Sequence, residues 1–243
     1  MRFKRPNRAF TLMELLVVLG VIALMMSVIL PTLHRVKESA RTIQCKTLIK
    51  NYSLALYAYF LQTNQLLPIS VQDWSRGIVM HPWHSLEEFR VLLNLPPTGP
   101  EYRDRRIGQL QEYKPAFERR FICPSAGYAL NHPEEGLYPM DRSYGLNAHV
   151  YYFEDYVRRR LESQSSRILC MADAMDWWMN YWQCDKYLEY GENWVGFNTY
   201  GTAAFRHQDK ANVSFWDGHV DQMTAEELKS HLRQWLDVDR SAK

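Results

Sequence analysis

RAFTLMELLVVLGVIALMMSVIL, residues 8–30, forms a long apolar stretch near the start of this 243-residue chain. The sixteen residues from Leu15 to Leu30 carry no ionisable group. A helix rises about 1.5 Å per residue, so residues 10–30 would span about 30 Å, the thickness of a hydrocarbon core. The sequence therefore predicts a membrane-spanning helix over residues 10–30.

The charges before this helix predict its orientation. Arg2, Lys4, Arg5 and Arg8 precede it without any acidic residue. Such a bias keeps the N-terminus cytoplasmic. We therefore expect a single-pass inner-membrane protein whose remaining residues are periplasmic. A cleavable secretory signal is the alternative, but the segment ILPTLH over residues 29–34 offers no good cleavage site.

Glu14 is the only charge between residues 10 and 30. A carboxylate at the centre of a membrane costs about 2.5–3.5 kcal/mol on the insertion scale. Cleavage between Ala9 and Phe10 would create an α-amino group at the same depth. We expect this amine to pair with Glu14 of a neighbouring copy.

Residues 9–18, AFTLMELLVV, resemble the prepilin signature G-F-T-L-x-E-L-L of type IV pilins and type II secretion pseudopilins, with Ala9 where Gly is usual. In that family a membrane peptidase cuts before the Phe and methylates its new amine, and the Glu guides filament assembly. The resemblance implies that Phe10 is methylated and that Glu14 is the assembly carboxylate. Pro31 stands where many pilins carry a helix-loosening proline.

The helix is expected to continue beyond the membrane. Residues 32–62 contain neither Gly nor Pro. Apolar residues recur there at spacings of three and four, as on one helix face: Cys45, Leu48, Tyr52, Ala55 and Tyr59. We therefore predict a leader over residues 1–9, a stem helix over 10–62 and a globular head over 63–243.

The head mixes short elements. We expect a helix over 85–95 and a terminal helix to about residue 235, capped by Thr224 with Glu227. Asp217-Gly218 predicts a type I′ hairpin turn. The runs expected to form strands are 120–123, 143–147, 167–172, 203–207, 211–216 and 219–223. The predicted fold class is α+β, with a long N-terminal hydrophobic helix and a small antiparallel-sheet head.

A second resemblance covers the head. Cys123-Pro124-Ser125, the segment SYGLN over 143–147, and His207 followed after nine residues by Asp217-Gly218 are similar to the H-X9-D-G class of prepilin-like proteins. That class is abundant in planctomycete, verrucomicrobial and lentisphaeral bacteria. The resemblance implies a filament-forming or secretion-associated subunit.

The His and Asp residues of the head allow two interpretations. One is a structural turn with His207 hydrogen-bonded nearby. The other is a site for Zn²⁺ or another divalent ion, formed by Asp173, His207, Asp217 and His219 if they converge. No Asp- and Asn-rich loop of the calcium-binding kind is present.

The four cysteines of an exported head allow three complete pairings. Our preferred pairs are Cys45–Cys123, which would tie the stem to the sheet, and Cys170–Cys184. Buried free thiols are the alternative.

Charge, aromatic content and missing motifs narrow the classes of function that the sequence supports. The net charge of +2 argues against nucleic acid as a partner. The aromatic-rich segment 177–200 would suit a glycan-binding or subunit-contact surface, or a cover for the sheet. No nucleophile elbow, H-E-x-x-H motif or Gly-rich phosphate loop is present.

We therefore expect a structural pilus or pseudopilus subunit rather than an enzyme, and no cofactor. Its expected partners are a prepilin peptidase and methyltransferase, other subunits and the inner membrane. The alternative is a membrane-tethered binding protein or a metal-dependent hydrolase that uses the predicted metal site.

Overall fold

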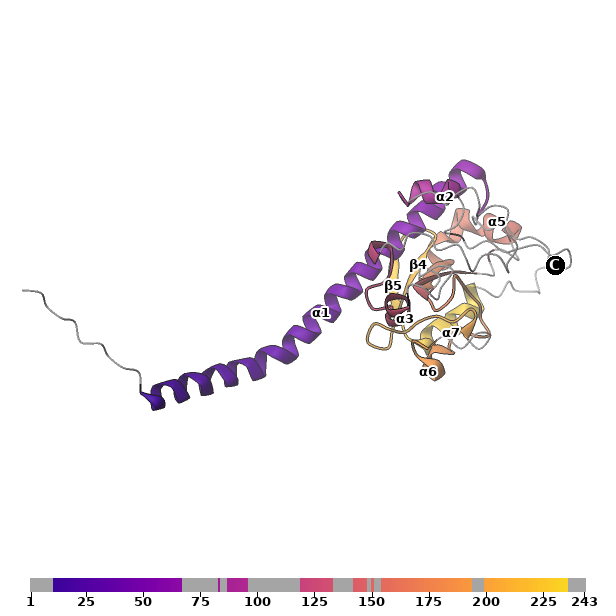
Figure 1. Ribbon diagram of the computed structural model, residues 1–243. Coiled ribbons are helices and arrows are strands. Elements are labelled where there is room, and N and C mark those ends of the chain that lie inside the picture. Colours follow the sequence, from indigo (N-terminus) through magenta and orange to yellow (C-terminus); the bar gives the residue numbers. More distant parts are fainter. Residues whose placement is uncertain are drawn as a thin grey trace, which may run out of the picture. The chain divides into compact units, whose positions relative to one another are not determined.

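The computed structural model describes residues 11–66, 83, 87–95, 119–132, 142–147, 150, 154–193 and 199–235, drawn as coloured ribbon in Figure 1. The chain divides into two units, Met1–Ala40 and Arg41–Lys243. The predicted α+β class with a long N-terminal apolar helix is confirmed.

Helix α1 runs from Leu12 to Thr63 and contains Pro31. It ends at Asn64, whose φ of 57° is left-handed and whose N–H donates to the Phe60 carbonyl at 2.8 Å. Every described side chain from residue 11 to residue 37 is exposed. The helix is long and apolar enough to cross a membrane.

Beyond residue 44, α1 buries one face in the second unit. The buried positions recur at helical spacing: Cys45, Ile49, Tyr52, Ser53, Ala55, Leu56 and Tyr59. Four of the five residues predicted for this face are therefore buried, and Leu48 is half-buried.

The sheet of the head has five strands in the order β3-β1-β2-β4-β5. Their bounds are β1 Tyr144–Asn147, β2 Leu169–Asp173, β3 Trp178–Met179, β4 Ala211–Phe215 and β5 Val220–Met223. The pairs β1–β2, β2–β4 and β4–β5 are antiparallel, as expected. Strand β3 pairs with β1 in parallel, so the sheet is mixed rather than purely antiparallel.

The outer part of α1 packs on one face of this sheet. The Tyr52 ring meets the Tyr144 ring edge-on with centroids 5.2 Å apart, and Ser53 Oγ donates to Ser214 Oγ at 2.6 Å. A second apolar cluster forms on the other face, where Leu228 of helix α7 (Ala225–Trp235) packs with Ala211 and Val213 of β4. Side chains along β4 point alternately to the two faces of the sheet, so this strand contributes to the packing on both.

Several short elements surround the sheet: α2 Glu87–Leu92, η5 Arg119–Phe121, α3 Gly127–Asn131, α5 Glu154–Gln164, η7 Ser165–Arg167 and α6 Tyr187–Tyr190. Two predicted strands are wrong. The run 120–123 lies in η5 and the turn after it, and the run 203–207 makes only an isolated bridge from Ala203 to Ala174. Short apolar runs do not distinguish a strand from a buried turn.

Candidate functional site

The N-terminal end of α1 is closed by a capping box. Thr11 donates to Glu14 Oε2 from both its backbone N–H and its hydroxyl, each at 2.9 Å. The Glu14 N–H returns a hydrogen bond to Thr11 Oγ1 at 3.2 Å. Glu14 and Thr11 therefore each satisfy one backbone donor of the other at the start of the helix. Ala9 and Phe10, the predicted processing residues, lie outside the described residues.

Pro31 lies inside α1, where it cannot donate the usual hydrogen bond to the Ser27 carbonyl. The helix continues through it, and the hydroxyls of two residues that flank Pro31 bond to backbone carbonyls within α1. Ser27 Oγ donates to the Leu24 carbonyl and Thr32 Oγ1 to the Ile29 carbonyl, both at 2.7 Å. A weakened backbone ladder is thus placed in the apolar half of the helix.

The nine residues between His207 and Asp217 in the H-X9-D-G element include all of β4, which has five residues, Ala211–Phe215. His207 lies before the strand and Asp217-Gly218 after it. Five strand residues alone span about 17 Å. His207 and Asp217 therefore belong to opposite ends of β4 and do not form one local site.

Both ends of β4, and its middle, contact α1. His207 Nδ1 lies 3.2 Å from Thr42 Oγ1 at one end. A Cβ placed on Gly218 at the other end would lie 3.3 Å from Leu54 Cδ2. Between them Ser214 bonds to Ser53. The element therefore lies along about three turns of the stem helix.

The turn at Asp217-Gly218 joins β4 to β5 as predicted, but its type differs. Gly218 has a φ of 84°, whereas Asp217 has no positive φ, so this is not a type I′ turn. The Gly218 N–H donates to the Phe215 carbonyl at 2.9 Å, and the Phe215 N–H to the His219 carbonyl at 3.1 Å. These bonds define a three-residue loop with glycine in the left-handed position.

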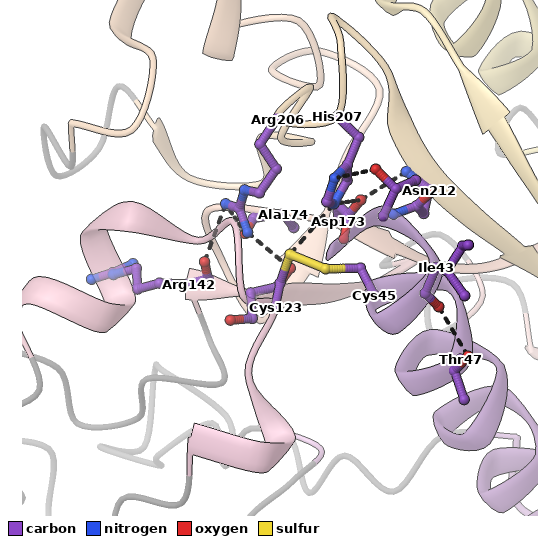
Figure 2. Close-up of a disulfide and its surroundings, with 12 residues drawn as sticks. Ile43, Cys45, Thr47, Cys123, Arg142, Asp173, Ala174, Arg206, His207 and Asn212 are labelled. Atoms are coloured by element: carbon purple, nitrogen blue, oxygen red, sulfur yellow. Dashed lines mark hydrogen bonds and ion pairs between the residues drawn. A yellow bond between two sulfur atoms is a disulfide. The ribbon is translucent and has the colours of Figure 1, made fainter. Parts of the chain in front are cut away.

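A buried polar cluster surrounds His207 (Figure 2). His207 Nε2 lies 3.4 Å from Cys123 Sγ and 3.4 Å from Asp173 Oδ2. Cys123 is joined to Cys45 of α1 by a disulfide. Asp173 ends β2, and its Oδ2 accepts the Asn212 N–H at 2.8 Å. Four segments distant in sequence therefore meet at His207.

Burial determines the charge states in this cluster. It raises the pKa of Asp173 to about 7, although the nearby Arg206 guanidinium and the hydrogen bonds from Asn212 oppose the rise. Burial lowers the pKa of His207 to about 4, and the positive charges of Arg206 and Lys46 act in the same direction. His207 is therefore neutral at neutral pH and keeps a lone pair on one ring nitrogen.

Arg206 is the buried cation beside this cluster. Its Nε donates to Glu192 Oε1 at 2.8 Å, and one terminal nitrogen donates to the carbonyls of Arg142 and Ala174, both at 3.2 Å. Its side chain is only 2% exposed. The guanidinium thus links the loop before β1 to the end of β2.

The predicted four-residue metal site is not formed. Asp173 and His207 lie together, but Asp217 and His219 lie beyond the far end of β4, where Asp217 Oδ1 contacts His219 Nδ1 at 2.5 Å. Cys45 and Cys123 stand beside Asp173 and His207 instead. The spacing of the cysteines in the sequence does not indicate that they lie beside Asp173 and His207, because these residues meet only when the stem packs on the sheet.

The cysteines form one of the two preferred pairs. Cys45 and Cys123 form a disulfide, whereas Cys170 and Cys184 are buried free thiols. The predicted Cys170–Cys184 bridge is therefore wrong. Cys170 packs in the apolar cluster that includes α1, and Cys184 packs in the cluster with α7. Burial raises the pKa of both thiols, that of Cys184 to about 12.

The described part of the aromatic-rich segment mainly covers the core. Trp177 packs against the cluster on the α1 side, and Tyr181 and Tyr187 pack against the other cluster. Trp182 is the exception, with 72% of its surface exposed. Trp194 and Phe197 lie outside the described residues.

Comparison with known proteins identifies the N-terminal segment. Residues 4–30 match the family described as the prokaryotic N-terminal methylation motif. No curated protein and no solved structure matches the chain. The motif implies processing by a prepilin peptidase and assembly with other pilin subunits, and proteins that carry it are typically structural. The match over residues 4–30, which overlaps the start of α1, thus supports a type IV prepilin-like protein.

Proposed function

We propose that this chain is a structural subunit of a type IV pilus-like filament or of a type II secretion pseudopilus. It is cleaved between Ala9 and Phe10 and methylated at Phe10. One observation carries the proposal: the methylation motif over residues 4–30 runs into α1, whose apolar side chains there are exposed. Such a surface requires either lipid or other helices as its surroundings.

The exposed apolar side chains of α1 also provide the surface for assembly. Before assembly the apolar half of α1 lies in the inner membrane, with the N-terminus cytoplasmic and the head periplasmic. Within a filament the same side chains pack against the helices of other subunits. Glu14 then pairs with the Phe10 amine of a neighbour, which sets the axial register of the helices.

Mass spectrometry of the mature protein from its native host tests the processing step. The expected N-terminal peptide begins at Phe10 and carries one methyl group. An Ala9→Gly variant restores the usual family residue and should be processed as well, whereas an Ala9→Trp variant should stay uncut. A mature protein that still begins at Met1, or that begins downstream of residue 30, would contradict the proposal.

Deletion of the gene for this chain in its host distinguishes a pilus subunit from a pseudopilus subunit. Loss of surface filaments in electron micrographs indicates a pilus subunit. Loss of exported proteins from the medium, with surface filaments unchanged, indicates a pseudopilus subunit. Re-expression of the wild-type chain is the control in both measurements.

The tethered-hydrolase alternative is not favoured. It requires Asp173, His207, Asp217 and His219 to share one site, but β4 separates the two halves of this set. The pair that does meet, Asp173 and His207, is buried, with exposed fractions of 0% and 1%. A substrate would have no access to these groups.

A further inference from the structure

The cluster around His207 contains four groups that bind transition metals. Cys45 comes from α1, Cys123 from the turn after η5, Asp173 from the end of β2, and His207 from the turn before β4. One potential ligand atom from each lies within 4.8 Å of all the others, and all four residues are buried. This observation is independent of the N-terminal motif on which the proposed function rests.

The distances match those between neighbouring ligands of a tetrahedral ion. Zn–S bonds of about 2.3 Å and Zn–N and Zn–O bonds of about 2.05 Å place adjacent N and O ligands about 3.3 Å apart, and N and S about 3.6 Å apart. His207 Nε2 lies 3.4 Å from Asp173 Oδ2 and 3.4 Å from Cys123 Sγ. The two sulfurs must separate, from a covalent bond to about 3.8 Å.

The hydrogen-bond partners of His207 and Asp173 leave both side chains able to bind a cation. Thr42 Oγ1 lies 3.2 Å from His207 Nδ1 and orients the ring so that Nε2 faces the cluster. Asn212 holds Asp173 Oδ2, whereas Asp173 Oδ1 has no hydrogen-bond partner among the described residues although it is buried. An unsatisfied buried carboxylate oxygen is costly, and a metal ion removes that cost.

We propose that Cys45, Cys123, Asp173 and His207 form a structural Zn²⁺ site when the disulfide is reduced. A dithiol reductant supplies two electrons and two protons, becomes a disulfide itself, and leaves two protein thiols. Zn²⁺ then binds two thiolates, the carboxylate and the neutral imidazole, and the thiol protons are released to solvent. A disulfide oxidant reverses the step: it takes two electrons from the two thiolates and two protons from solvent, becomes a dithiol, and the ion leaves as the Cys45–Cys123 bond forms again. Disulfide and metal are thus alternative links between α1 and the sheet.

Cobalt titration of the full-length chain in detergent tests this site. The chain is reduced under argon with a phosphine, which is removed before Co²⁺ is added. The reduced chain should bind one Co²⁺, with a thiolate-to-cobalt charge-transfer band and the visible bands of tetrahedral cobalt. Zn²⁺ should abolish these bands, and the oxidised chain should show none. Absence of the bands from the reduced chain, or equal binding by the oxidised chain, overturns the proposal.

Matched variants separate metal binding from folding. Asp173→Asn and His207→Gln should weaken Co²⁺ binding at least tenfold. Their folding is checked by whether they still form the Cys45–Cys123 disulfide on oxidation, and only variants that do so are compared. The control variant C170A/C184A lacks the other two thiols and should bind Co²⁺ as the wild type does. Unchanged binding by the folded Asp173 and His207 variants, or loss of binding by the control, overturns the site.

Discussion

Glu14 Oε2 accepts two hydrogen bonds from Thr11, one from the backbone N–H and one from the hydroxyl, each at 2.9 Å. The carboxylate that we assign to contact between subunits is therefore also a helix cap within its own chain. The same arrangement closes α7, where Thr224 donates from its N–H and its hydroxyl to Glu227 Oε2. In the proposed pairing with a neighbouring subunit, Glu14 either keeps its hydrogen bonds from Thr11 or exchanges them for one from the neighbour's Phe10 amine.

Variants at residues 11 and 14 separate the two roles of Glu14. Glu14→Ala removes both the cap and the charge, and we expect a chain that is inserted in the membrane but absent from filaments. Thr11→Ala removes the capping hydroxyl at a cost of about 0.5–2 kcal/mol and keeps the charge, so it should still assemble. Filament recovery and membrane fractionation measure the two outcomes. Equal assembly defects in both variants would show that capping alone accounts for Glu14.

Loss of the Cys45–Cys123 link should destabilise the head. The bridge closes a separation of 78 residues, for which chain entropy predicts a contribution of about 4.5 kcal/mol. We expect a C45A/C123A variant, without added metal, to unfold at a clearly lower urea concentration than the oxidised wild type, followed by tryptophan fluorescence in detergent.

The other two cysteines provide the control for this link. Because Cys170 and Cys184 are free thiols, a C170A/C184A variant should keep its sensitivity to reductant. Its urea midpoint should fall on reduction by as much as that of the wild type. A midpoint that no longer responds to reductant would contradict the observed pairing.

Gly218 should tolerate asparagine better than alanine. Its φ of 84° lies in the left-handed region, which costs a residue with a side chain about 1–2 kcal/mol, whereas asparagine enters this region more readily than most. Both substitutions place a Cβ near Leu54 Cδ2, so this contact does not account for a difference between them. Urea unfolding of the two variants provides the comparison, and equal losses would exclude backbone strain as the cause.

The Ser53–Ser214 hydrogen bond between α1 and β4 can be measured with a double-mutant cycle. Each hydroxyl also has a backbone carbonyl within reach, that of Ile49 for Ser53 at 2.9 Å and that of Met171 for Ser214 at 3.2 Å. We expect each single change to alanine to cost about 1 kcal/mol and the double change less than the sum. Strict additivity would show that the two hydroxyls do not stabilise each other.

Sequence patterns predicted the elements that form from local signals. The apolar residues of α1 repeat at helical spacing, the Thr224–Glu227 pair caps α7, and Asp217-Gly218 joins β4 to β5. Strand β3 could not be predicted, because two residues that pair in parallel with a distant strand leave no alternating pattern. Within the run 120–123, Phe121, Ile122 and Cys123 are apolar because they pack in the same cluster as the stem, where Tyr52 Oη donates to the Phe121 carbonyl at 2.6 Å.

Of the candidate sites, too, the sequence predicts the local one and not the one that depends on packing. The processing motif is contiguous and was identified from the sequence, and residues 4–30 match its family. The cluster around His207 depends on how four segments pack, which residue spacing does not encode. The nine-residue spacing after His207 is visible in the sequence, but it reflects a turn followed by the strand β4 rather than the geometry of a ligand site.

The position of the Cys45–Cys123 bridge has a mechanical consequence. A pull applied along the N-terminal part of α1 reaches the head at Cys45, eighteen residues before the helix ends at Thr63. The covalent link gives that pull a direct path to Cys123, in parallel with the noncovalent packing of α1 on the sheet. A filament of such subunits would resist traction without straining the last turns of the helix.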